Sequence, residues 1–542
     1  MKTIEANIVD VIQKKIFPAR IFFDTHIQKI EPLPFTNENR FILPGFVDAH
    51  VHIESGMLPP SEFARMAVRH GTLAAVSDPH EIANVLGMEG IDFMIADAAR
   101  VPFRFVFGAP SCVPATPFET AGANITVDDI DKLFHEGKTG YLSEMMNFPG
   151  VVHNDPEVMA KIAVAKKYGK TIDGHAPGLS GEALQSYIDS GISTDHECTT
   201  VEEAEEKIRA GMKILIREGS AAKNFDVLCP LIDKYPDKVM LCTDDLHPDD
   251  LLRGHINKLI AKGVEKGLDL FSILRAATLN PCEHYQIDLG LVQVGDYADF
   301  IIVDNLEEFN VLQSFSRGIC VFNRIGDEPD LQLKPAMTSV SNCFGATPIT
   351  VSDIQVVATS DKMKVMQVFD GELFTKKNFA DVKKGFPMIS NTTADILKIV
   401  VLNRYQPAKP AVAFIHGFGL KQGALVSTVA HDSHHIVAVG CDDISIVKAI
   451  NHVIDIKGGL AAIYRQQIIG LNLDIAGLMS SASGEEVALA YEKLNSVASR
   501  MGSKLTSPFM TLSFMALLVI PELKLGDKGL FDVGQFNWTD LF

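Results

Sequence analysis

Short apolar runs rich in β-branched residues recur along the first half of the chain, at intervals of about 20 to 36 residues. Charged, alanine-containing stretches with apolar positions at helical spacing separate them, for example 202–209 and 249–262. This alternation is typical of repeated βα units, and eight units predict an α/β fold with a (β/α)8 TIM-like barrel at 43–288. The strands are expected at 46–51, 73–76, 103–107, 140–142, 171–172, 192–194, 212–216 and 239–242.

The segments on either side of the barrel return to short β patterns. Residues 4–42 alternate apolar and polar positions, and so do 295–304 and 318–323. We expect these segments to pair in a small split β-sandwich domain, made of 1–42 plus 289–330. Residues 326–345 are rich in Pro, Asp and small residues, which indicates a linker.

An additional C-terminal α/β domain is expected over 340–542, where it would cap the active site. It mixes strand patterns with late helical patterns. The strands are expected at 353–358, 396–402, 411–415 and 436–440, and a helix is expected at 484–501.

Composition narrows the class of protein and its partners. Hydrophobic residues make up 47% and charged residues 22%, as in well-cored globular proteins. The net charge of −19 argues against nucleic acid or an anionic membrane as a partner. Eight scattered cysteines without a Cys-x-x-Cys pair, and a start without a signal-peptide layout, predict a cytoplasmic protein. The apolar run 509–520 is too short to cross a bilayer.

Polar residues with metal-binding chemistry follow the predicted strands. His50 and His52 are two apart on one strand, so their side chains share a face and could hold one divalent ion. Taken alone, such a pair is more often two hydrogen-bonded core histidines. However, six of the eight runs are followed directly by His, Asp or Glu, at the strand ends where barrel active sites lie.

These strand ends supply six candidate metal ligands: His50, His52, Glu144, His175, His196 and Asp244. The set exceeds the needs of one tetrahedral ion and fits two ions about 3.5–4 Å apart. Glu144 is the expected bridge, because its strand lies between the two groups of histidines. Mixed nitrogen and oxygen ligands suit zinc, manganese or ferrous iron.

Several motifs support a family resemblance. The run Pro-Gly-Phe-Val-Asp-Ala-His-Val-His at 44–52, Thr-Asp-Asp at 243–245 and the closing strand at 298–304 resemble the amidohydrolase superfamily, which comprises metal-dependent hydrolases on a (β/α)8 barrel. Ser-Asp-Pro-His-Glu-Ile-Ala-Asn at 77–84, Glu144 in place of a modified lysine, and Ala-His-Asp-Ser-His-His at 430–435 are similar to the bacterial adenine deaminases within it. This similarity covers essentially the whole chain.

The resemblance implies hydrolysis of adenine to hypoxanthine and ammonia by a homodimer that carries two divalent ions, with Mn²⁺ or Fe²⁺ expected ahead of Zn²⁺. A hydroxide that bridges the ions would attack the ring carbon bearing the amine, because a metal lowers the pKa of bound water to about 7. Asp244 would bind a metal and move a proton to the departing amine. A second acid would protonate the ring nitrogen, and Glu81, Glu197 and Glu218 are all candidates.

The remaining candidate residues lie in loops. His80 is expected at the barrel rim as a metal ligand, a substrate contact or a partner of a ligand. His431, His434 and His435 are either solvated or part of a cap that shields the purine from water. The predicted catalytic residues are Asp244, Glu81, His80 and Glu218, and the predicted substrate contacts are His80, Glu81, Glu197 and His434.

Two alternative functions stay open. The same site could hydrolyse a cyclic amide or an N-acetyl group, or the chain could be an inactive relative that serves as a scaffold. The presence of all six candidate ligands argues against the scaffold. A zinc nucleotide deaminase is disfavoured because 281–285 lacks the second Cys of Pro-Cys-x-x-Cys. The chain also has no phosphate-binding Gly-x-x-x-x-Gly-Lys-Ser/Thr loop.

Overall fold

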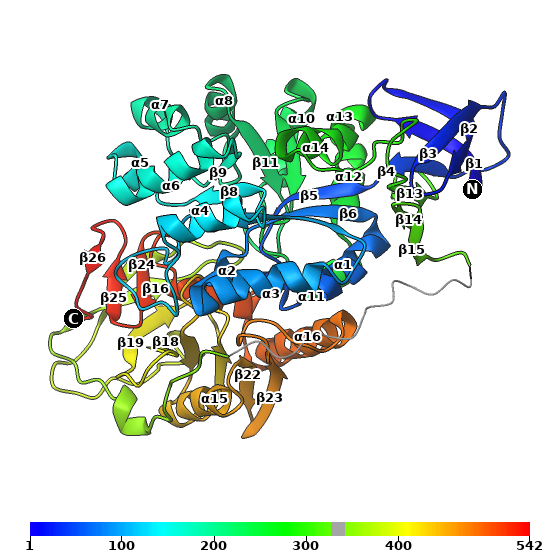
Figure 1. The fold of residues 1–542 in the computed structure, drawn as a ribbon. Helices are drawn as coiled ribbons and strands as arrows, with labels where there is room; N and C mark the ends of the chain where they lie inside the picture. Colours follow the sequence, from blue (N-terminus) through cyan, green and yellow to red (C-terminus); the bar gives the residue numbers. More distant parts are fainter. Residues whose placement is uncertain (327–341) are drawn as a thin grey trace.

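The structure, a computed structural model, describes residues 1–326 and 342–542. Figure 1 shows a small β domain next to the N-terminus, a barrel in the middle and a third domain that carries the C-terminus. Most of the linker predicted at 326–345 lies outside the described residues. The domain limits drawn from the sequence stay a prediction.

Eight parallel strands form the barrel, and each overlaps a predicted strand. A five-stranded sheet (β5 to β9) and a three-stranded sheet (β10 to β12) share the ring. Backbone hydrogen bonds join the two sheets, with Ser193 N donating to Ile172 O at 3.0 Å and Asp244 N donating to His50 O at 2.9 Å. The strands are β5 (Phe46–Val51), β6 (Thr72–Ser77), β7 (Arg104–Ala109), β8 (Tyr141–Met145), β9 (Ile172–Gly174), β10 (Thr194–Asp195), β11 (Lys213–Arg217) and β12 (Val239–Cys242).

Helices surround these strands, as Figure 1 shows. The helix predicted at 202–209 is α8, and it begins after Thr200, whose hydroxyl accepts the amide of Glu203. The single helix predicted over 249–262 is wrong. The segment instead forms two helices, α11 and α12, because extended backbone at Gly254 interrupts the helix. The Asn257 side chain then accepts a hydrogen bond from the amide of His255.

The helices between β5 and the end of the barrel are α1 (Pro60–Ala67), α2 (His80–Leu86), α3 (Met88–Ala98), α4 (Val127–His135), α5 (Phe148–Val152), α6 (Pro156–Lys167), α7 (Gly181–Asp189), α8 (Val201–Arg209), α9 (Phe225–Leu228), α10 (Pro230–Lys234), α11 (Pro248–Arg253), α12 (Ile256–Glu265), α13 (Leu270–Ala276) and α14 (Leu279–Tyr285). Two 3-10 turns, η1 (Ile53–Gly56) and η2 (Val68–His70), flank α1.

The small β domain is one seven-stranded sheet in the order β15-β14-β13-β4-β1-β2-β3. Its two halves come from either side of the barrel and meet where β4 pairs with β13, so the predicted pairing is confirmed. The ring of Phe23 on β2 lies 5.0 Å from that of Phe300 on β13, although β1 and β4 separate these strands in the sheet. Since adjacent strands are about 4.8 Å apart, the sheet must curl over a shared apolar core.

The strands of this domain are β1 (Lys2–Asp10), β2 (Lys15–Phe23), β3 (Ile27–Pro32), β4 (Phe41–Pro44), β13 (Phe300–Val303), β14 (Val311–Ser316) and β15 (Ile319–Asn323).

The third domain is built on an eight-stranded sheet in the order β17-β16-β19-β18-β21-β20-β22-β23. Helix α15 packs apolar residues such as Ile446 and Ile450 against one face of this sheet. The strand predicted at 353–358 is wrong, because a capping box between Thr350 and Asp353 starts the 3-10 turn η3 instead. The helix predicted at 484–501 is α16.

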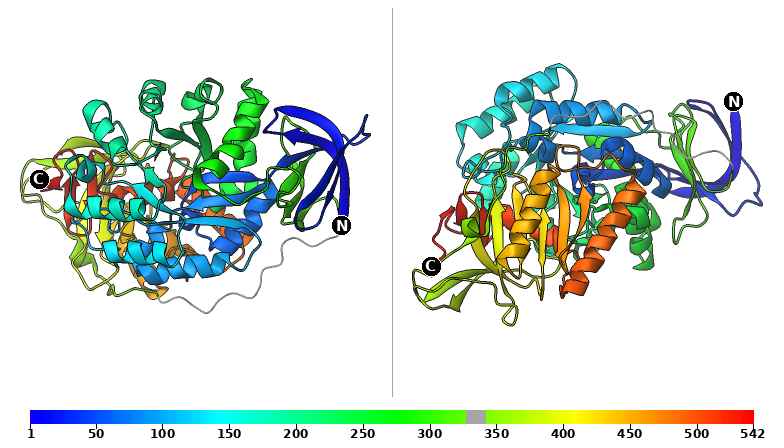
Figure 2. Two further views of the ribbon diagram at one scale, coloured as in Figure 1. Left: turned by 45° about the horizontal axis from the view of Figure 1, so that its top comes forward. Right: turned by 90° about the horizontal axis from the view of Figure 1, so that it is seen from below.

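The elements of this domain are η3 (Val351–Ile354), β16 (Lys362–Gln367), β17 (Lys376–Asp381), β18 (Ile396–Leu402), β19 (Ala411–His416), β20 (Ala424–Ser427), β21 (Ile436–Gly440), α15 (Asp443–Asp455), β22 (Gly459–Tyr464), β23 (Gln467–Asn472), α16 (Gly484–Met501), α17 (Pro508–Ser513), η4 (Phe514–Ala516), β24 (Leu523–Gly526), β25 (Gly529–Asp532) and β26 (Asn537–Trp538). Figure 2 shows this domain from two further directions.

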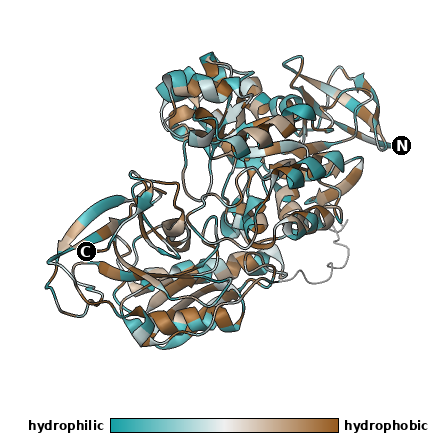
Figure 3. Ribbon diagram, turned by 60° about the vertical axis from the view of Figure 1, so that its left-hand side comes forward, coloured by the Kyte–Doolittle hydropathy of each residue, from teal (hydrophilic) through white to brown (hydrophobic). Residues whose placement is uncertain are grey.

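Polar contacts join the third domain to the barrel. Gly484 N donates to Glu62 Oε2 at 2.9 Å, and Arg65 forms ion pairs with both Glu62 and Glu485. In Figure 3 the inner strands of the third domain carry mostly the hydrophobic colour, whereas the barrel helices show both hydrophilic and hydrophobic segments. No helix in the described part of the chain is long and apolar enough to span a membrane.

Candidate functional site

Strand β5 brings His50 and His52 to the carboxyl end of the barrel. Both side chains are buried, and their ring centroids lie 4.8 Å apart. Nε2 of His50 lies 3.4 Å from Oδ1 of Asp244, and Nε2 of His52 lies 3.2 Å from the same oxygen. The two imidazoles therefore face one carboxylate oxygen from two sides.

The two histidines differ in their electrostatic surroundings. Burial and the nearby His196 lower the pKa of His50, which keeps its ring neutral and able to donate a lone pair. Burial and His80 also lower the pKa of His52, but hydrogen bonds with Asp244 and Glu144 outweigh them and leave it well above its usual value. The carboxylates at this site thus attract positive charge strongly.

Glu144, at the end of β8, joins the two groups of histidines. Its Oε1 lies 3.2 Å from Nε2 of His52. Its Oε2 lies 2.9 Å from Nδ1 of His175 and 3.3 Å from Nε2 of His196. Burial raises the pKa of Glu144, but its hydrogen bonds with the three imidazoles outweigh burial and hold the pKa well below its usual value. An ionised carboxylate with each oxygen facing different histidines has the geometry of a bridging ligand.

Arg217, which sequence reasoning missed, holds Asp244 in place. Its Nη1 donates to Oδ2 of Asp244 at 2.5 Å, and its Nη2 donates to Oε2 of Glu197 at 3.0 Å. Burial raises the pKa of Asp244, but the Arg217 guanidinium and the nearby histidines outweigh it and hold the pKa well below its usual value. The available signal was the position of Arg217 directly after the apolar run 212–216.

A second buried cluster joins the barrel rim to the third domain. Glu81, in the first turn of α2, forms short hydrogen bonds with Nδ1 of His431 and Nε2 of His434. His80 links the two clusters, because its Nδ1 lies 3.6 Å from Oε1 of Glu144 and its Nε2 lies 3.5 Å from Oε1 of Glu81. Burial lowers the pKa of His431, but Glu81 outweighs this effect and raises it to about 9.

The other predicted residues divide into those near the cluster and those away from it. Glu197 faces the metal-ligand candidates, with Oε1 3.3 Å from Nε2 of His196. Glu218 instead accepts a hydrogen bond from Nζ of Lys262 at 3.1 Å, and within the described chain its side chain forms no hydrogen bond or ion pair with the other predicted site residues. The side chain of His435 points away from the cluster and into the third domain itself, where its Nε2 lies 3.5 Å from Oδ1 of Asp527.

The donor atoms present fit divalent cations. Possible ligand atoms lie within 4.8 Å of one another in several sets of buried and half-buried residues. His50 Nε2 is buried and lacks a hydrogen-bond partner in the described part of the chain, as a lone pair kept for a metal would be. The sets are His52, Asp78, His80 and Glu144; His50, His196 and Asp244; Glu144, His175 and His196; His80, Glu81 and Asp432; and Glu81, Asp245 and His431.

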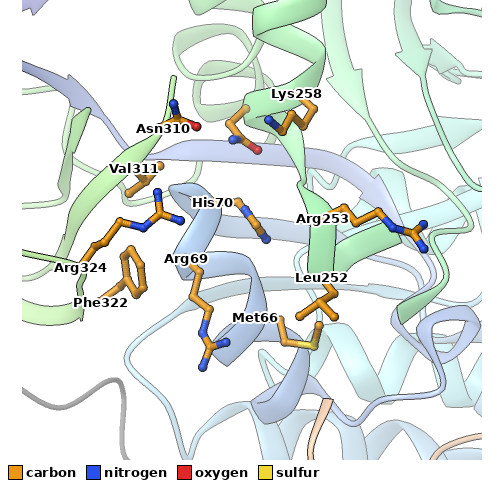
Figure 4. A pocket seen from close by; sticks show the side chains of 11 residues that line it. Met66, Arg69, His70, Leu252, Arg253, Lys258, Asn310, Val311, Phe322 and Arg324 are labelled. Carbon is orange, nitrogen blue, oxygen red and sulfur yellow. The ribbon is translucent and has the colours of Figure 1, made fainter. Parts of the chain in front are cut away.

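A surface pocket of about 340 Å³ lies elsewhere, between the barrel helices and the small β domain (Figure 4). Arg69, His70, Lys258 and Arg324 are among its lining residues, and none of the predicted site residues lines it. The predicted chemistry therefore belongs to the buried cluster and not to this pocket.

Comparison with known proteins identifies the family. A family model described as amidohydrolase family matches residues 41–321, and one described as adenine deaminase C-terminal domain matches residues 372–537. The adenine deaminase of Methanosarcina barkeri is 52% identical over 100% of both chains. Those of Sulfurovum sp. and Borreliella burgdorferi are 51% and 46% identical over 99% of both chains. The chain belongs to the adenine deaminase family.

The relationship to adenine deaminases covers both sides of the second cluster. Glu81 lies within the amidohydrolase match, whereas His431 and His434 lie within the match to the adenine deaminase C-terminal domain. As a member of the amidohydrolase family, the protein has a divalent metal centre.

Proposed function

We propose that the protein is an enzyme that hydrolyses adenine to hypoxanthine and ammonia. Full-length similarity to adenine deaminases supports this function, and the buried cluster around Glu144 and Asp244 is the observation that carries the chemistry. In this reaction the ring carbon loses its amine and gains an oxygen from water. One proton of the water must reach the departing amine, and the ring nitrogen must be protonated for the carbon to accept the attack.

Six residues would hold the metal centre: His50, His52, Glu144, His175, His196 and Asp244. A pair of divalent ions, when bound, supplies the Lewis acidity that activates water near neutral pH. The ligand set suits Mn²⁺ or Fe²⁺, with Zn²⁺ as the alternative.

Asp244 is the proposed proton carrier. Arg217 donates to its Oδ2 and keeps the carboxylate ionised, while its Oδ1 faces His50 and His52. Asp244 takes a proton from the attacking water and transfers it to the departing amine. As both steps need a basic oxygen fixed beside the reacting carbon, the guanidinium acts as a positioning group.

Glu81 is the proposed source of the ring-nitrogen proton. Of the three candidates, Glu197 is held ionised by its ion pair with Arg217, and Glu218 is bound to Lys262 away from the cluster. Burial raises the pKa of Glu81, but His431 and His434 outweigh burial and hold it well below its usual value, so Glu81 is ionised as well. Unlike Glu197, it shares a hydrogen bond with His431, whose raised pKa keeps a proton on this pair at neutral pH. His80 and His434 would contact the substrate from the same side.

The third domain would close the site. Because His431 and His434 reach Glu81 across the barrel rim, the third domain covers this part of the barrel and would exclude water from the purine. Assembly as a homodimer and a cytoplasmic location stay predictions from the sequence, to be tested by analytical ultracentrifugation and by localisation of the tagged protein.

The test uses purified protein loaded separately with Mn²⁺, Fe²⁺ and Zn²⁺ and offered adenine, adenosine and a cyclic amide. We expect the ultraviolet change from adenine to hypoxanthine with at least one metal. Asp244→Asn should abolish turnover while bound metal remains measurable. Hydrolysis of the cyclic amide without any adenine turnover would contradict the proposal, and near-normal activity of Asp244→Asn would remove Asp244 from its role.

A further inference from the structure

The loop 110–126 between β7 and α4 lies at the carboxyl ends of the barrel strands, where barrel enzymes bind their substrates. The third domain fixes this loop. Nζ of Lys528 donates to the carbonyl oxygen of Phe118 at 2.8 Å, and the Phe118 ring packs 5.0 Å from that of Phe531 on β25. Thr120 N donates to Oδ1 of Asp527 at 3.3 Å. Between these two anchored residues, the Glu119 side chain is only 6% exposed.

Glu119 lacks the partners that a buried carboxyl group needs. Its Oε1 accepts a long hydrogen bond of 3.5 Å from the Thr116 hydroxyl, and the Ser433 hydroxyl also interacts with the carboxyl group. Its Oε2 has no partner with hydrogen-bond geometry in the described part of the chain. Oδ2 of Asp432 is also buried without a hydrogen-bond partner there. Two buried carboxylate oxygens left without hydrogen-bond partners indicate that a polar ligand completes them.

Contacts lead from the metal-ligand candidates towards Glu119. Nδ1 of His80 lies 3.6 Å from Oε1 of Glu144, and its Nε2 lies 3.8 Å from Oδ1 of Asp432. Burial, followed by the charge of Asp432, raises the pKa of Glu119 to about 8, which keeps the carboxyl protonated at neutral pH. A protonated carboxyl has an O–H donor and a carbonyl acceptor side by side.

Adenine presents a matching edge. With the amine-bearing carbon towards the metal ligands, the opposite edge of the purine carries the N3 acceptor next to the N9–H donor. We propose that Glu119 binds this N3/N9–H edge and thereby selects the free base over nucleosides. A sugar on N9 would remove the donor and would collide with a loop that the third domain holds in place. This inference rests on the proposed adenine deamination and adds the residue that reads the far edge of the base.

The test compares Glu119→Ala and Glu119→Gln in the metal-loaded enzyme, with adenine and 9-methyladenine as substrates. Loss of the paired hydrogen bonds in Glu119→Ala should lower kcat/KM for adenine roughly 5- to 150-fold, mainly through KM. The ratio of kcat/KM for adenine to that for 9-methyladenine should fall by at least about tenfold, because a site built for a polar edge rejects analogues that lack it. Glu119→Gln keeps a donor and an acceptor and should retain most of the discrimination.

Thr120→Ala is the matched control, because it alters the adjacent position of the same loop, where Thr120 contacts Asp527 of the third domain and not Glu119. It should leave the substrate ratio unchanged. If Glu119→Ala fails to fold, a second measurement uses 3-deazaadenine as an inhibitor of the wild type and of Glu119→Gln. We expect 3-deazaadenine to bind both proteins more weakly than adenine does. Normal adenine turnover with an unchanged substrate ratio in Glu119→Ala, or equal binding of 3-deazaadenine and adenine, would overturn this inference alone. No adenine turnover by the wild type would instead overturn the proposed function.

Discussion

Replacing Arg217 by Met tests how the site balances its buried charges. Arg217 is 5% exposed and donates to both Asp244 and Glu197, so its removal leaves two buried carboxylates without their counter-charge. Breaking a buried ion pair by removing one partner costs about 3–5 kcal/mol. We expect the metal-free Arg217→Met variant to lose stability on this scale.

Arg217→Met should also weaken metal binding, because Arg217 orients the Asp244 carboxylate that would hold a divalent cation. Removal of a group that orients a metal ligand weakens metal binding about 10- to 100-fold, which corresponds to about 1.4–2.7 kcal/mol. The variant should therefore bind Mn²⁺ more weakly than the wild type, and added Mn²⁺ should stabilise it less than it stabilises the wild type. Turnover should fall together with metal affinity.

Urea unfolding with and without Mn²⁺, combined with metal titration, measures both effects. Arg65→Met is the matched control, because Arg65 also bridges two carboxylates, Glu62 and Glu485, at the contact between barrel and third domain. It should leave Mn²⁺ affinity unchanged. Wild-type stability and wild-type Mn²⁺ affinity in Arg217→Met would refute the proposed role of Arg217.

Three further predictions concern single residues. Glu218→Gln should leave kcat and KM for adenine within about twofold of wild type, because Glu218 binds Lys262 rather than the cluster; a loss beyond about 100-fold, the scale of a general acid, would contradict this placement. Burial and the charges of Asp432 and Asp527 raise the pKa of Glu119 in the folded protein to about 8, above its value of 4.5 in the unfolded chain. The free energy of unfolding should therefore fall as the pH rises from 4.5 to 8, by up to about 1.4 kcal/mol per pH unit. Urea unfolding across this pH range should show that Glu119→Gln lacks this part of the pH dependence of stability. The same pH dependence in the variant and the wild type would contradict the prediction. Burial lowers the folded pKa of Lys524 from 10.5 to about 7, so stability should decrease as pH falls through this window, and Lys524→Met should abolish that slope in thermal unfolding.

The barrel was predictable because its signals are local in sequence. Each strand is a short apolar run, and parallel strands carry their end residues to a common rim. Residues as distant as His50 and Asp244 are therefore assigned to one place by the sequence alone. The wrongly predicted helix and strand have local causes that the spacing of apolar residues does not indicate. Gly254 interrupts a helix whose apolar spacing continues, and the Thr350–Asp353 capping box turns a β-like run into a 3-10 turn.

The less predictable part of the site depends on contacts between distant segments. Sequence placed Glu81 and His434 near the purine, but only the structure shows the third domain bringing His434 onto Glu81. Arg217 and Glu119 gave weak signals, because a strand-end arginine and a loop glutamate are ordinary on a surface. Their burial and their partners decide their roles.

Anomalous diffraction from crystals of the Mn²⁺-loaded protein tests the central claim most directly. We predict two peaks about 3.5–4 Å apart at the carboxyl end of the barrel, with the Glu144 carboxylate between them and Asp244 bound to one ion. A single peak, or two peaks that neither Glu144 nor Asp244 contacts, would contradict the account.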